Sequence, residues 1–219
     1  MHIVLLFIGR FPKWNIFPEF YKNAHFLAKL LYVVVFGCFS TIVCVCFFIS
    51  LNRYIATTNP LTYKRFFSKK NILKMIISIL LLSSLIGLGK VFFNPCMVPR
   101  DIGGYFAVVR SKTVAYYDLS YTFLIYLPLF LLSLYFNFST IYYLKKMNKK
   151  KKVLQKNKTL YLYGFAYIIV FNILIAYHTI VIVAEFSQNI NISNLLIMIN
   201  IYATDSMTIG LFYFMIFIR

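Results

Sequence analysis

"LLYVVVFGCFSTIVCVCFFISLN", which runs from Leu30 to Asn52, is a long apolar run. Its 23 residues include no charged side chain, although Lys29 and Arg53 stand directly at its two ends. A helix rises about 1.5 Å per residue, so an uncharged run of this length crosses a hydrocarbon core of about 30 Å. The sequence therefore predicts a transmembrane helix over residues 30–52.

The composition of the whole chain agrees with a membrane protein. Of the 219 residues, 61% are hydrophobic and 13% are charged, whereas soluble domains carry about 25% charged residues. The 23 Lys and Arg side chains outnumber 5 Asp and Glu side chains, which gives a net charge of +18. Because the basic residues lie between apolar runs, they indicate membrane topology and contacts with anionic lipids rather than nucleic-acid binding.

Other charge-free intervals predict the remaining spans. The second interval contains Lys90, whose ammonium group we expect to snorkel towards the membrane surface. The fold class that follows is all-α, a polytopic transmembrane helix bundle in one domain over residues 1–219. Its predicted spans are 30–52, 75–93, 119–144, 159–184 and 192–218, with a partial span at 1–9.

The loops between these spans alternate in charge. Basic residues are dense in 53–74 and in 145–158, but sparse in 94–118 and absent near Gln188. The positive-inside rule therefore places the two basic loops in the cytoplasm. The triplet "NIS" at Asn191 then falls in an outer loop, where it is a candidate glycosylation site.

No catalytic or metal-binding pattern is present in the sequence. The histidines His2, His25 and His178 do not pair with other ligands at metal-site spacing, and the four cysteines form no metal or disulfide framework. The paired glycines in "GGYFAVV" lack the strand-to-helix context of a phosphate-binding loop and favour a turn. We therefore expect no enzyme activity, no cofactor and no metal.

Polar groups inside spans are the stronger functional candidates, because ionisable residues in a membrane usually face a bundle interior or a cavity. Asp205 lies near the middle of the last predicted span. It is either part of a ligand, ion or switch site or a structural acid held by neighbouring hydroxyls. His178 lies towards the outer end of its span and is either a ligand contact or a structural residue. Pro128 is expected to kink its helix because it frees a backbone carbonyl.

The segment "LNRYIATTNPLTYKRFF" resembles the end of the third helix in seven-helix G-protein-coupled receptors. Arg53, Tyr54 and Pro60 match the arginine, the aromatic residue and the loop proline of that motif. Asn52 stands where the motif usually has an acid, so the lock through a neighbouring carboxylate is missing. The resemblance implies a G-protein coupling surface. Its candidate residues are Asn52, Arg53, Tyr54, Pro60, Lys64 and Arg65.

Nearly the whole chain is similar to nematode serpentine chemoreceptors of the class gamma and class V group. The resemblance rests on "LNR", "FIGRFPKWNIFPEF", "GGYFAVV" and the terminal "DSMTIGLFYFMIFIR". It implies a receptor that binds a small chemical cue outside the cell and activates a heterotrimeric G protein inside it. The implied location is the plasma membrane, in multi-pass form, and more specifically a sensory cilium.

Three features depart from the family pattern. The last helix lacks its usual proline, and no cysteine in 25–31 is available to pair with Cys96. Helix 1 and most of helix 2 also have no counterpart, so the intact gene is expected to encode about 60 to 100 more N-terminal residues. Two rival readings stay open: a transporter or channel subunit that uses Asp205 as its ion site, and a non-functional truncated receptor fragment.

Overall fold

The computed structural model describes residues 11–99, 104–109, 111–148, 169, 172–173, 175–176, 178–183 and 186–187. The predicted partial span 1–9, the predicted span 192–218, Asn191 and Asp205 lie outside these residues. The predicted span 159–184 is described only in part.

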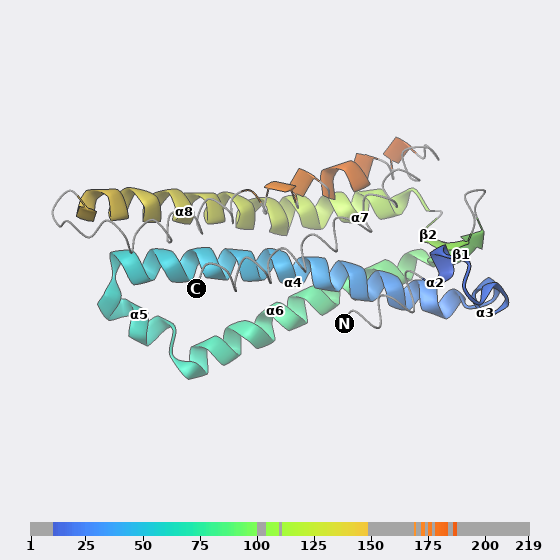
Figure 1. Ribbon diagram of the computed structural model, residues 1–219, viewed down its shortest axis with the longest axis horizontal. Coiled ribbons are helices and arrows are strands. Elements are labelled where there is room, and N and C mark those ends of the chain that lie inside the picture. The colour runs from blue at the N-terminus through green and yellow to red at the C-terminus, as the bar shows by residue number, and fades with distance from the viewer. Residues whose placement is uncertain are drawn as a thin grey trace. The chain divides into compact units, whose positions relative to one another are not determined.

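Long apolar helices dominate the described residues (Figure 1). Helix α4 covers His25–Thr58, and α6 covers Lys69–Gly89 and continues as the 3₁₀ helix η2, Lys90–Phe93. Helix α7, Thr113–Tyr121, runs through the π-helical segment η3, Thr122–Tyr126, into α8, Leu127–Asn148. By length and composition, three of these stretches can cross a membrane: His25–Thr58, Lys69–Phe93 and Thr113–Lys146.

Helix α4 continues beyond the predicted span 30–52 and ends at a local sequence signal. The hydroxyl groups of Thr57 and Thr58 both donate to the Tyr54 carbonyl in the last turns, at 2.9 and 2.8 Å. Pro60 then opens the short helix α5, Pro60–Phe66, at a position where its missing N–H costs nothing. The sequence "ATTNP" therefore ends one helix and starts the next.

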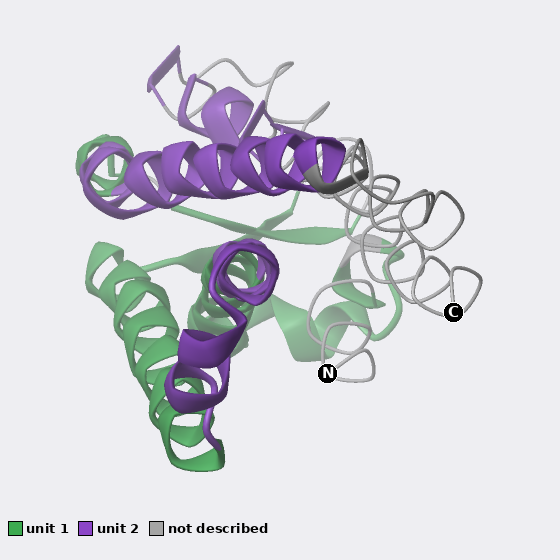
Figure 2. Ribbon diagram, turned by 90° about the vertical axis from the view of Figure 1, so that its left-hand side faces the viewer, with its two compact units in different colours: residues 1–45, 69–117 green, residues 46–68, 118–219 purple. Residues whose placement is uncertain are grey.

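The described residues belong to two compact units (Figure 2). Unit 1 consists of Met1–Val45 and Lys69–Tyr117, and unit 2 consists of Cys46–Ser68 and Asp118–Arg219. Helix α4 therefore contributes its first part to unit 1 and its last part to unit 2. Each unit has its own packing, described separately below.

In unit 1, α4 and α6 approach each other closely at a pair of glycines. A Cβ atom added to Gly87 would lie 2.5 Å from the Val33 carbonyl oxygen and 3.3 Å from the Gly37 nitrogen. Ser83 precedes Gly87 by one helical turn and is buried. Small residues four apart are the usual means by which membrane helices bring their backbones together. The crossing of α4 and α6 is thus built on Gly37, Ser83 and Gly87.

Unit 1 also contains a hairpin that the sequence did not predict. Strands β1, Cys96–Pro99, and β2, Tyr105–Val108, pair antiparallel with Cys96 opposite Val108 and Pro99 opposite Tyr105. Gly104 precedes β2 with φ 78°, a conformation that a residue without a Cβ adopts at little cost. The Tyr32 hydroxyl on α4 donates to the Ala107 carbonyl of β2 at 3.4 Å, which ties the hairpin to the helix.

The expected snorkelling of Lys90 is wrong, because the side chain is fully buried in unit 1. Its ammonium nitrogen lies 4.1 Å from the centroid of the Phe36 ring on α4. A cation over an aromatic face gains electrostatic stabilisation that water would otherwise supply. One helical turn before Lys90, the Ile86 carbonyl accepts a hydrogen bond from the Tyr117 hydroxyl at 2.9 Å, and the Tyr117 ring fills the space beside Gly89.

Candidate functional site

A buried polar contact joins α4 to α8 within unit 2. The Asn137 side-chain amide donates to the Ser50 hydroxyl at 3.0 Å, and this hydroxyl donates in turn to the Cys46 carbonyl at 2.9 Å. Ser50 and Asn137 are 2% and 4% exposed. Interhelical hydrogen bonds of this kind specify which helix faces meet in a membrane protein. The contact lies one helical turn before Arg53.

Aromatic packing extends this contact along α4. The Tyr54 ring stacks on Phe136 with centroids 5.0 Å apart and lies 6.2 Å from Tyr135, while Phe47 approaches Phe136 at 6.0 Å. Ring pairs at these separations contribute beyond their buried area. Tyr54 is therefore an inter-helix packing residue and not an exposed neighbour of Arg53.

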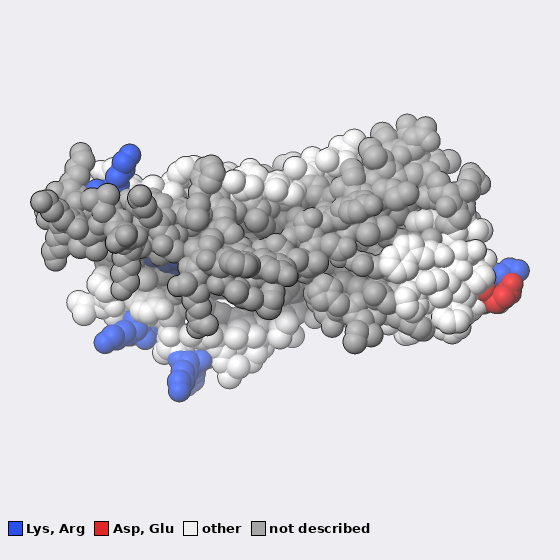
Figure 3. Space-filling view, in the orientation of Figure 1, with Lys and Arg blue, Asp and Glu red and all other residues white. Residues whose placement is uncertain are grey.

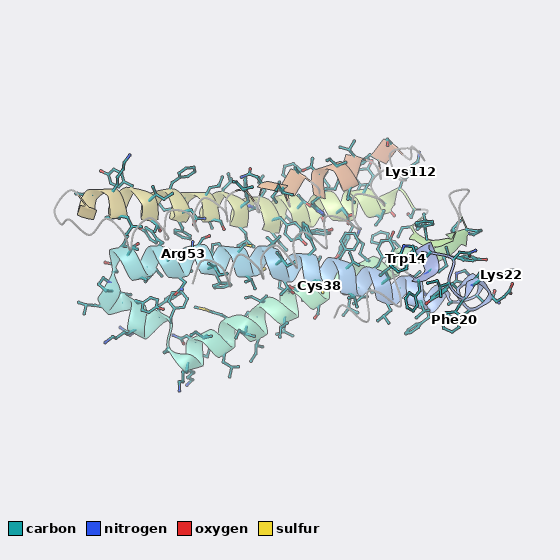
Figure 4. All side chains as sticks on the ribbon, in the orientation of Figure 1. Trp14, Phe20, Lys22, Cys38, Arg53 and Lys112 are labelled. Atoms are coloured by element: carbon teal, nitrogen blue, oxygen red, sulfur yellow. The ribbon has the colours of Figure 1, made fainter. Side chains whose placement is uncertain are left out.

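Arg53 is half-buried on α4, where Figure 4 labels it, and its Nη1 atom is shielded from solvent. Asn52 is also half-buried, so the residue at the usual acidic position is an amide partly enclosed by protein. Pro60, Lys64 and Arg65 are exposed on α5, and Figure 3 shows the basic side chains of this helix at the surface. The candidate coupling residues thus divide into a half-buried group on α4 and an exposed group on α5.

A second cluster in unit 2 surrounds His178. Its Nε2 atom lies 2.7 Å from the Thr122 hydroxyl oxygen, and this hydroxyl donates its proton to the Asp118 carbonyl at 2.6 Å. The imidazole ring packs against Tyr121 and Tyr126 with centroids 5.6 and 5.3 Å apart. His178 is 2% exposed, and both the Asp118 side chain and the Tyr126 ring are fully buried.

The π-helical segment η3 makes this cluster possible. It places Tyr121 and Tyr126, five residues apart, on one side of the helix, where their rings meet edge to face at 5.1 Å. Pro128 follows η3 by two positions and is exposed. Wide turns of this type occur often at functional sites. The cluster is therefore a compact polar and aromatic group built from η3, the end of α7 and the helical residues 178–183.

Sequence reasoning selected His178 but missed its partners Tyr121, Thr122 and Tyr126, and it also missed Ser50 and Asn137. Asn137 belongs to the triplet "NFS" inside a predicted span. An amide in the middle of an apolar helix is itself a signal of an inter-helix contact. Among the described residues, no group of His, Cys, Asp and Glu side chains could hold a metal ion, and no disulfide joins the four cysteines, all of which are described.

Comparison with protein families decides what these helices belong to. The sequence pattern of the Srg family chemoreceptors matches residues 3–219. The chain belongs to the Srg chemoreceptor family. A search of curated proteins found no similar sequence.

Membership of the Srg family, together with the apolar helices, confirms several predictions. The chain is a nematode-type serpentine chemoreceptor with an all-α transmembrane helix bundle. It is a membrane protein, and its family is a family of receptors rather than enzymes. The residue-level roles predicted for Arg53, Asp205 and the other candidates remain predictions.

Proposed function

We propose that this Srg receptor binds a small chemical cue from outside the cell and activates a heterotrimeric G protein inside it. The family match supports a chemosensory role, and the charge of the loops supports the orientation. In this orientation the cluster around His178 lies towards the outside, and Arg53 with helix α5 faces the cytoplasm. The proposed location is the plasma membrane, and a sensory cilium is the compartment that suits such a cue.

One observation carries the mechanism. The continuous helix from Asp118 to Asn148 contacts His178 near its beginning and Ser50 near its middle, both within unit 2. A ligand that binds the two states of such a helix with different affinity shifts the equilibrium between them. A change at the His178 cluster would thereby alter the Ser50–Asn137 and Tyr54–Phe136 contacts beside Arg53. We infer that the helix transmits the signal in this way.

The experiment is a nucleotide-exchange assay on the full receptor expressed with a heterotrimeric G protein and exposed to a library of small volatile and water-soluble compounds. Any compound that activates the wild type is then applied to Arg53→Ala. Coupling free energies between sites typically change affinity by about 5–150-fold. We therefore expect Arg53→Ala to lower G-protein nucleotide exchange at least about fivefold when its surface expression equals that of the wild type. Lys112→Ala, which changes an exposed lysine on the proposed outer side, is the matched control.

Normal G-protein activation by Arg53→Ala would contradict the role of this arginine. A parallel set, His178→Ala and Thr122→Val, tests the outer cluster. These variants should weaken the response to the compound while leaving the maximal G-protein activation intact. If they instead abolish activation at every concentration, the cluster serves the helix structure and not the recognition of the cue.

A further inference from the structure

The segment before α4 presents a group of exposed aromatic side chains. Helix α2 covers Phe11–Lys13, and α3 covers Pro18–Lys22. Trp14, Phe17 and Phe20 in this segment are 54%, 62% and 54% exposed. Figure 4 labels Trp14 and Phe20, whose side chains lie near the start of α4. We call residues 11–23 the N-terminal foot.

Other residues of the foot pack against the rest of unit 1. Tyr21 and Pro12 are buried, as is Pro95 next to β1, and both short helices contact the β1–β2 hairpin. The Ile16 amide donates to the Phe11 carbonyl at 3.0 Å, and the Ala24 amide donates to the Tyr21 carbonyl at 3.2 Å. The foot therefore combines buried residues that pack within unit 1 with exposed aromatic side chains.

The backbone of the foot adopts a costly conformation. Asn15 and Phe17 have φ angles of 56° and 57°, in the left-handed region. Asparagine tolerates this region, but a bulky aromatic residue such as Phe17 adopts it only at an energetic cost. Strain of this kind persists where the surroundings compensate for it. Packing within unit 1 does not compensate for the strain at Phe17, because the Phe17 ring is mostly exposed.

We propose that the N-terminal foot is a membrane-interface anchor, with its exposed aromatic side chains inserted among the lipid headgroups of the leaflet at the start of α4. Trp and other amphipathic aromatic groups prefer the headgroup layer, and apolar faces at that depth penetrate about 5–10 Å. Lys22 on α3 is exposed, and its ammonium group can pair with lipid phosphate. The occupant of the aromatic surface is thus lipid.

Continuity with the transmembrane surface favours lipid over other occupants. The foot joins α4 through Asn23 and Ala24, and Phe26 in the first turn of α4 is 72% exposed. The apolar run of α4 begins at Leu30, so the foot lies close to the level where the hydrocarbon core ends. Aromatic side chains that are exposed at that level, directly before a span, therefore meet lipid.

The chain carries a single tryptophan, Trp14, which makes a direct test possible. The full receptor is reconstituted into vesicles of phosphatidylcholine and phosphatidylserine, and Trp14 fluorescence is measured with aqueous iodide and with lipids brominated at different depths. We expect weak quenching by iodide. We expect bromine near the glycerol to quench Trp14 more strongly than bromine at the end of the lipid acyl chain. The two efficiencies should place the Trp14 ring within about 10 Å of the headgroup boundary.

Two further variants serve as second probe and control. Trp14→Phe combined with Phe20→Trp moves the tryptophan reporter to position 20 and should give the same quenching pattern. Trp14→Phe combined with Lys112→Trp places the reporter at an exposed residue of unit 1 outside the foot, where iodide should quench strongly and brominated lipid weakly.

Each alternative occupant gives its own result. Strong iodide quenching at Trp14 together with no effect of brominated lipid would mean that the foot faces water, which overturns the proposal. Weak quenching by both agents would mean that protein, including a second copy of this chain, covers Trp14, and this also overturns it. The Phe20→Trp reporter excludes an effect peculiar to one side chain.

Discussion

Replacing Gly87 with alanine tests the close approach of α4 and α6. The new Cβ would lie 2.5 Å from the Val33 carbonyl oxygen, about 0.9 Å closer than the ordinary 3.4 Å contact. The neighbouring atoms belong to the backbone, so relief requires the two helices to separate. Overpacking of this kind costs about 1–3 kcal/mol, whereas alanine gains about 1 kcal/mol over glycine in helix propensity. We expect a net loss of about 0–2 kcal/mol.

Gly37→Ala is the matched control, because it brings the same gain in propensity without the overlap. Its Cβ would lie 3.4 Å from the Ser83 carbonyl oxygen, an ordinary contact. We therefore expect Gly37→Ala to be neutral or stabilising by up to about 1 kcal/mol. The difference between the two variants isolates the backbone clash, at about 1–3 kcal/mol.

A thiol-reactive dye measures the melting temperature of both variants in the detergent-solubilised receptor. Cys44 and Cys46 are each 4% exposed, so they react as the fold opens on heating. For a chain of this size, 1 kcal/mol corresponds to about 2–4 °C in melting temperature. Gly87→Ala should melt below Gly37→Ala by at least about 2 °C. Equal melting temperatures would refute the close crossing of α4 and α6 at Gly87.

Two more predictions concern single contacts. In a double-mutant cycle of Ser50→Ala and Asn137→Ala, we expect a coupling of about 0.6–1.7 kcal/mol, measured by the same dye assay; strictly additive effects would exclude the hydrogen bond. Burial raises the pKa of the Tyr21 phenol above its ordinary 10.0, so the folded state favours the neutral form. The contribution of Tyr21 to the stability of the folded state is therefore complete below about pH 10. It is lost as the pH rises through the higher pKa of the folded state. The melting temperature of Tyr21→Phe should fall less steeply with pH than that of the wild type above about pH 10. Equal slopes in the two proteins would contradict the burial of Tyr21.

The long helices were predictable because lipid leaves a backbone few alternatives to helix. The ends of the helices were less predictable, because a charge-free interval stops at the first charged residue whether or not the helix ends there. Arg53 and Tyr54 illustrate the difference: the predicted span stops at Asn52, but α4 continues to Thr58 because nothing before Asn59 and Pro60 interrupts its backbone bonds.

Contacts between segments distant in the sequence could not be predicted in the same way. Thr122 and His178 are 56 residues apart, and Ser50 and Asn137 are 87 residues apart. Hydropathy places such residues in helices but does not set the rotation of each helix about its axis. Lys90 shows the same limit, because its burial depends on Phe36 in another helix.

The π-helical segment η3 has a consequence for the phase of its helix. In regular α spacing, the buried face after Tyr121 would continue at residue 124 or 125, but Leu124 is 77% exposed and Tyr126 is fully buried. The wide turn thus inserts one residue and rotates everything after it by about 100° relative to an unbroken α-helix. It is this rotation that brings Ser133 and Asn137 onto the buried side. Over evolutionary time, η3 is therefore a place where this helix can lose one residue by exchanging its wide turn for a regular one, while Ser133 and Asn137 keep their buried side.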